Sequence, residues 1–242
     1  MALQVTSGTR RPRAGAGSLA AVYPRGEAMK IRLVLLSSVF VLLAAFAAAA
    51  AQRVVSPAVP DAVFEVDAGF EALPALRFPI ADSTDAERHL FVDAPGGVVR
   101  RMLVLQFETV QAGSDFRFVF PSSPPRQFGP HVYRAGTYAY DDVLAAARAP
   151  GFEAARTRAA LAAAGLEAPR YWHVARLARV ADASGLHEAI VFYMENADAR
   201  YPKGLVEVDA DGDGLLDAEE AVRLWRELER VLAVRPADSP AD

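Results

Sequence analysis

An acidic stretch near the C-terminus carries the clearest chemistry in this 242-residue sequence: residues 209–220 read DADGDGLLDAEE. Oxygen-bearing groups fall at positions 1, 3, 5, 7, 9 and 12, and a glycine stands at position 6. A twelve-residue loop with this spacing can supply the six to eight oxygen ligands that Ca²⁺ takes. The predicted ligands are Asp209, Asp211, Asp213, Asp217 and Glu220 through their carboxylates, and Leu215 through its backbone carbonyl.

This stretch resembles an EF-hand calcium loop, and the resemblance covers about residues 201–234. It implies that Glu220 binds Ca²⁺ with both oxygens and that Asp217 binds directly or through water. Gly214 would allow the turn with a positive φ, and Leu216 would pin the loop to a core. A helix with one apolar stripe should follow, formed by Ala221, Leu224, Trp225, Leu228 and Val231.

The sequence departs from the EF-hand pattern in two ways. Pro202 and Gly204 interrupt the place of the entering helix, and the residues from Leu205 alternate like a strand. The chain also holds one such loop, whereas EF-hands usually act in pairs. A lone loop must pack on its own domain, bind weakly or pair across a homodimer.

A solvated acidic turn is the alternative interpretation of residues 209–220, because Asp and Gly are common in turns. Such a turn has no reason to fill every ligand position and then start an amphipathic helix. We therefore expect Ca²⁺ binding, in a mainly structural role.

The N-terminal region has the pattern of an export signal. From Met29, two cations precede an apolar run that starts at Leu33 and ends in alanines up to Ala51. Residues 1–51 are therefore predicted to be a leader and signal peptide, with Met29 as a candidate start. An uncleaved anchor is the alternative, and both interpretations place the body outside the cytoplasm, in the periplasm or secreted.

Composition restricts the class of partner. The chain has no cysteine, which excludes disulfides and thiol chemistry. Residues 1–51 contain six of the 26 Lys and Arg residues and one of the 30 Asp and Glu residues, so the body carries a charge of about −9. An acidic body is unsuited to nucleic acid, and membrane contact is expected only through an uncleaved N-terminal segment.

The expected fold class is α+β, a mostly antiparallel sheet with an inserted helical pair, followed by the EF-hand-like loop and helix. Residues 52–62 are predicted to be a linker, residues 63–200 the α+β domain and residues 235–242 a disordered tail. Strand-length apolar or alternating segments begin at Val63, Leu76, His89, Val98 and Phe116. Residues 141–165 suggest two helices split by Pro150 and Gly151, and residues 171–180 favour a strand, with a helix as the alternative.

The role of residues 63–200 stays open in the sequence. One alternative is an envelope enzyme with acid and base groups on the final hairpin, drawn from His173, His187, Glu188 and Glu195. Another is a module in which calcium exposes the stripe of Leu224, Trp225 and Leu228 to a partner. An aromatic group is expected to lie mainly in the core, with a ligand cleft as the alternative; it comprises Tyr133, Tyr138, Tyr140, Tyr171 and Trp172.

Overall fold

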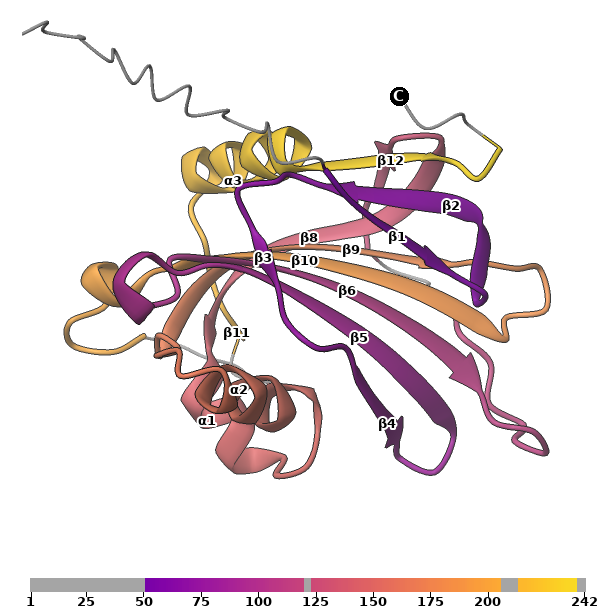
Figure 1. The fold of residues 1–242 in the computed structure, drawn as a ribbon, viewed down its shortest axis with the longest axis horizontal. Helices are drawn as coiled ribbons and strands as arrows, with labels where there is room; N and C mark the ends of the chain where they lie inside the picture. Colours follow the sequence, from indigo (N-terminus) through magenta and orange to yellow (C-terminus); the bar gives the residue numbers. More distant parts are fainter. Residues whose placement is uncertain (1–50, 120–122, 206–212, 239–242) are drawn as a thin grey trace, which may run out of the picture. The chain divides into compact units, whose positions relative to one another are not determined.

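The structure is a computed structural model that describes residues 51–119, 123–205 and 213–238. Of these residues, 47% lie in strands and 21% in helices. The predicted α+β class with an inserted helical pair is therefore wrong, because the fold is a β-rich one in which antiparallel sheets dominate (Figure 1). The helices cover parts of the sheet, but they contain less than half as many residues as the strands.

The main sheet is antiparallel throughout and has the strand order β11-β8-β9-β10-β6-β5-β3, with β4 also paired to β5 and β7 to β8. Its strands are β3 (Glu71–Ala72), β4 (Leu76–Ile80), β5 (Thr84–Asp93), β6 (Arg101–Val110), β7 (Pro125–Phe128), β8 (His131–Asp141), β9 (Tyr171–Val180), β10 (His187–Asn196) and β11 (Asp213–Gly214).

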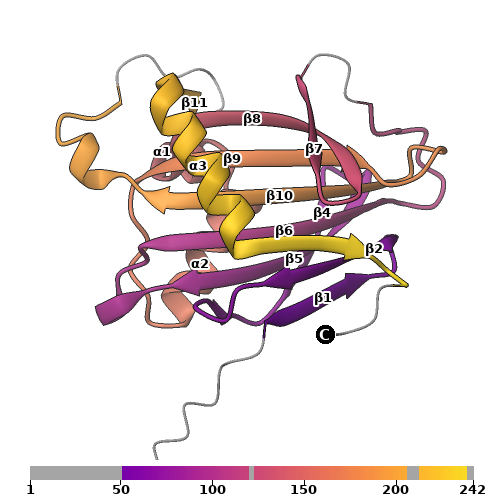
Figure 2. The ribbon, with the colours of Figure 1, turned by 90° about the horizontal axis from the view of Figure 1, so that it is seen from above.

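A second sheet and the last helix lie over one face of the main sheet (Figure 1). This sheet has the order β1-β2-β12, and it consists of β1 (Gln52–Ser56), β2 (Val59–Val66) and β12 (Leu232–Pro236). The helix α3 (Ala218–Val231) leads directly into β12 and crosses strands of the main sheet (Figure 2).

Two boundaries predicted from the sequence are therefore corrected. Residues 52–62 are not a linker, because they form β1 and the start of β2. Their prolines are compatible with a hairpin: Pro57 lies in the turn, and Pro60 lies beyond the residues of β2 that pair with β12. The predicted tail, residues 235–242, begins within β12, where Arg235 donates to Glu65 at 2.7 Å.

The main sheet is the middle layer between two apolar cores. On β6, Leu103, Leu105 and Phe107 face the core under α3 and the small sheet. The alternate residues Met102 and Val104 face the opposite core. Because successive side chains of a strand point to opposite faces, a strand covered on both sides is apolar without alternation, as the sequence of β6 is.

Two short helices, α1 (Asp142–Arg148) and α2 (Glu153–Ala163), lie over the second face of the main sheet (Figure 1). Asp141 caps α1 by accepting from the Leu144 N–H at 3.0 Å. Gly151, between the helices, and Gly165, after α2, both have a positive φ. α2 ends before β9, and the strand predicted for residues 171–180 is confirmed over the helical alternative.

Two 3-10 turns complete the described elements, η1 (Pro95–Gly97) between β5 and β6 and η2 (Asp198–Arg200) after β10. Among the described residues, no helix is long and apolar enough to cross a membrane. The predicted leader and signal segment lies outside the described residues, except for Ala51.

Candidate functional site

The last predicted calcium ligands lie at the start of α3. Asp217 is the N-cap of this helix, and its Oδ1 accepts from the Glu220 N–H at 2.8 Å. Glu220 lies in the first turn, where negative side chains are favoured by the exposed N–H groups of the helix. Positions 9 and 12 of the acidic stretch therefore meet at one helix end.

The Glu220 carboxylate is held by two basic residues. Arg223 donates to it through Nε at 2.9 Å and through a terminal nitrogen at 2.7 Å. His173 Nδ1, from β9, lies 2.7 Å from Glu220 Oε1, and its Nε2 lies 2.9 Å from the Tyr201 hydroxyl. Arg223 also donates to both oxygens of Glu195 on β10. The first turn of α3 is thus tied to two strands of the main sheet.

These contacts fix the charge of Glu220. The hydrogen bonds from Arg223 lower the pKa of Glu220 to about 2, with His173 acting in the same direction and burial opposing it. Since an ionised carboxylate only accepts hydrogen bonds, His173 donates to Glu220 from Nδ1, and its Nε2 forms a hydrogen bond with the Tyr201 hydroxyl. Glu220 is therefore an anion at neutral pH, as a calcium ligand must be.

The middle of the acidic stretch is anchored to the edge of the main sheet. In β11, Asp213 pairs with Tyr140 and Gly214 with Ala139. Gly214 therefore lacks the positive φ expected of it, because its backbone takes part in strand pairing. Leu216 packs against the core under α3, as expected, whereas the side chain of Leu215 is 89% exposed.

The remaining predicted ligands are described only in part. Asp209 and Asp211 lie outside the described residues, and Asp213 is described through its backbone alone. Within the described ranges, no three His, Cys, Asp or Glu side chains gather as a metal site. Asp217 and Glu220, however, place carboxylate oxygens at one end of a helix, and such oxygens are the ligands that a hard cation such as Ca²⁺ prefers.

The residues of the enzyme alternative do not form one cluster. His173 and Glu195 are opposite each other in register, but His173 contacts Glu220 and Tyr201, while Glu195 accepts from Arg223 and from Tyr193. His187 lies at the other end of the hairpin, 3.1 Å from the Thr109 hydroxyl. No hydrogen bond in the described part of the chain joins either histidine to Glu188 or Glu195.

Glu188 lies on the other face of the sheet, beside a second buried carboxyl group. It is 4% exposed and pairs in register with Glu108, which is 6% exposed. Burial and the charge of Glu108 raise the pKa of Glu188 to about 8. Its Oε1 is buried and accepts no hydrogen bond from the described part of the chain, and an Arg176 nitrogen lies 3.9 Å away. Glu188 therefore holds its proton at neutral pH.

The stripe of the partner-binding alternative is part of the protein's own core. Leu224 and Leu228 are fully buried, and Trp225 packs beside them under Arg126, whose guanidinium lies 4.4 Å from the Trp225 ring centroid. Exposing the stripe would require α3 to leave the main sheet.

Sequence reasoning missed the contacts that hold Glu220, although it named His173 as a candidate acid or base group. Arg223 follows Glu220 by three residues, a helical spacing that brings opposite charges together and could have indicated the pair. His173 and Tyr201 reach Glu220 through the fold alone, because no local pattern relates a strand histidine to a residue 47 positions later.

Comparisons with known proteins identify no relative. No family model, no curated protein and no solved structure matches the chain.

Proposed function

We propose that this is an exported protein that binds one Ca²⁺ ion through the loop at residues 209–220, in a mainly structural role. The ligands are Asp209, Asp211, Asp213, Asp217, Glu220 and the carbonyl of Leu215. The observation that carries the proposal is the placement of Asp217 and ionised Glu220 together at the N-terminus of α3, directly after the acidic stretch.

The structural role follows from the contacts of Glu220. Through His173 and Arg223, this carboxylate connects α3 to β9 and β10. An ion bound to Glu220 and to the preceding loop joins these elements to the sheet edge at β11. The burial of Leu224 and Leu228 supports stabilisation over exposure of a partner surface.

Calcium and Arg223 compete for the same carboxylate. Bidentate binding of Ca²⁺ needs both Glu220 oxygens, which Arg223 contacts. If Ca²⁺ displaces Arg223 from Glu220, the Arg223 guanidinium keeps Glu195 as an acidic partner. The expected affinity is therefore that of extracellular modules, with a Kd on the order of 0.1 to 1 mM. The export pattern at residues 29–51 is compatible with calcium at such concentrations.

The test is the thermal midpoint of the full chain with 5 mM Ca²⁺, with 5 mM Mg²⁺ and with chelator. At the expected affinity, 5 mM Ca²⁺ stabilises the folded state by about 1 to 2 kcal/mol, which raises the midpoint by about 2 to 8 °C. Glu220→Gln should lose this increase. Glu219→Gln is the matched control, because Glu219 is an exposed neighbour outside the predicted ligand set, and it should keep the increase.

An equal response of the Glu220 and Glu219 variants would contradict the proposed site. Analytical sedimentation tests whether the single loop pairs with the same loop of a second copy in a homodimer. β11 pairs with the chain's own sheet, so we expect a monomer with and without calcium, and calcium-dependent dimerisation would place part of the site on a second copy.

A further inference from the structure

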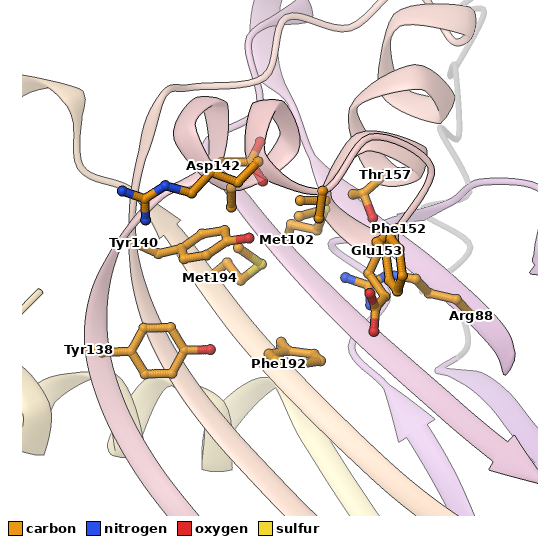
Figure 3. A pocket seen from close by; sticks show the side chains of 14 residues that line it. Arg88, Met102, Tyr138, Tyr140, Asp142, Phe152, Glu153, Thr157, Phe192 and Met194 are labelled. Atoms are coloured by element: carbon orange, nitrogen blue, oxygen red, sulfur yellow. The ribbon is translucent and has the colours of Figure 1, made fainter. Parts of the chain in front are cut away.

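A cavity of about 310 Å³ separates the helices α1 and α2 from the main sheet (Figure 3). Its volume is at the lower end of the range for small-molecule sites. Six of the lining side chains are aromatic or thioether groups, namely Met102, Tyr138, Tyr140, Phe152, Phe192 and Met194. Phe152 is 41% exposed, although it lines the cavity. The cavity is therefore suited to an apolar body that enters beside Phe152.

A buried cation lies at one side of this cavity. Arg88, from β5, is 6% exposed and donates to Gln106 Oε1. Its guanidinium lies 5.4 Å from the ring centroid of Phe192. The Arg88 Nε is buried and forms no hydrogen bond, and no carboxylate in the described part of the chain forms an ion pair with this guanidinium. Burial lowers the pKa of Arg88, and the nearby charges of Glu153, Asp142 and Glu108 raise it without forming an ion pair. An anion in the cavity would supply the direct contact that these carboxylates do not make, which lowers the cost of burying the charge.

Two further hydrogen-bonding groups face the same side. Thr157, from α2, is 3% exposed, and its buried hydroxyl has no hydrogen-bond partner among the residues that the structure describes. It lies on the side of Arg88 and Phe152 (Figure 3). The first turn of α2 also lines the cavity, and its N-cap Phe152 supplies no side-chain acceptor. Helix N-termini have unpaired N–H groups and favour anions. Arg88, Thr157 and this helix end therefore present donors to one region.

The acidic groups of the cavity differ in their partners. Asp142 receives a hydrogen bond from Arg158 at 2.7 Å, so its charge is compensated. Glu153, in the first turn of α2, lies beside Arg88 (Figure 3) without forming an ion pair with it. The negative charge of Glu153 therefore repels a ligand anion from a distance. It does not occupy the hydrogen-bond donors of Arg88 that the anion would contact.

We propose that this cavity binds a small monocarboxylate with an apolar body, whose carboxylate contacts Arg88 and Thr157 and whose body lies between Phe192, Tyr138 and Phe152. The cavity and the α3 end of the proposed calcium loop lie on opposite faces of the main sheet (Figure 1), and they adjoin at its edge, where Tyr140 lines the cavity and pairs with Asp213.

The test is a ¹H–¹⁵N NMR titration of the full chain with benzoate, beside benzamide and benzylamine as neutral and cationic analogues. Saturable shifts of signals from the first turn of α2 and from β10 near Phe192 are expected with benzoate. Benzamide should bind at least ten-fold more weakly, since it lacks the charge that strengthens the hydrogen bonds to arginine. No shift with benzoate up to 20 mM, or equal or tighter binding of benzamide or benzylamine, would overturn the proposal.

Two variants test the assignment of residues. Glu153→Gln removes the opposing charge and should strengthen benzoate binding by two-fold or more, with benzamide binding unchanged. Arg88→Met should abolish benzoate binding, whereas the matched control Arg77→Met, at an exposed position of β4, should leave it intact. Weaker benzoate binding by the Glu153 variant would overturn the proposal, whether or not the Arg88 variant folds.

Discussion

Replacing Glu188 by glutamine is expected to flatten the pH dependence of folding stability between about pH 5 and pH 8. The pKa of this buried carboxyl group is about 8 in the folded chain, compared with 4.5 for an unperturbed glutamate. The folded state therefore holds a proton that the unfolded state has lost, and folding stability falls as the pH rises from 4.5 to 8. Each pKa unit corresponds to about 1.4 kcal/mol, so this fall is at most about 5 kcal/mol.

The assay is the free energy of unfolding in urea at pH 5, 6, 7 and 8. The glutamine variant cannot ionise and is expected to become more stable than the parent chain as the pH rises, by several kcal/mol at pH 8. Titrating groups that do not interact with Glu188 contribute equally in both chains and cancel in the difference, whereas Glu108, which is coupled to Glu188, contributes to it. Exposed Glu71 provides the matched control, because Glu71→Gln removes a carboxylate at a solvent-facing position of β3.

The difference between the parent chain and the Glu188 variant is the decisive quantity. If it is the same at pH 5 and pH 8, then Glu188 is ionised at neutral pH in the folded chain, and the raised pKa inferred from its burial and from the charge of Glu108 is wrong. A difference of the same size for the Glu71 variant would also refute the reasoning, because it would not depend on burial.

Two further changes probe the region around α3. Arg223→Met should increase calcium affinity, because it removes the cation that competes for the Glu220 carboxylate; calorimetric titration measures the change, and weaker binding would show that Arg223 positions Glu220 for the ion. Leu228→Ala should cost about 2 to 5 kcal/mol in urea unfolding, because this side chain is fully buried in the core under α3. Exposed Val222→Ala should cost less than about 0.5 kcal/mol, and equal losses would mean that α3 does not pack as described.

The individual strands of the main sheet could be predicted better than the fold class. Long apolar runs mark β6 and β10, and the turn residues at 182–185 mark the hairpin between β9 and β10. The small sheet could not be predicted, because the prolines of residues 52–62 suggested a linker and because β12, the second partner of β2, lies about 170 residues away. Strand pairing over such a distance depends on tertiary contacts that no short window contains.

The candidate sites also combine features that local sequence patterns predict with features that depend on long-range contacts. The ligand spacing at residues 209–220 and the amphipathic helix that follows are local patterns, so both could be stated before the fold was known. The contact of His173 with Glu220 depends on α3 crossing β9. The burial of Arg88 depends on α1 and α2 covering the second face of the sheet, and an arginine within a strand otherwise suggests a solvent-facing position.

Calorimetric titration of the full chain with Ca²⁺ at millimolar concentrations tests the central claim most directly. We predict saturable binding of one ion per chain, absent in the Glu220→Gln variant and retained in the Glu219→Gln variant. The absence of a saturable heat of binding, or equal binding by the Glu220 variant, would contradict the proposal that residues 209–220 surround a calcium ion.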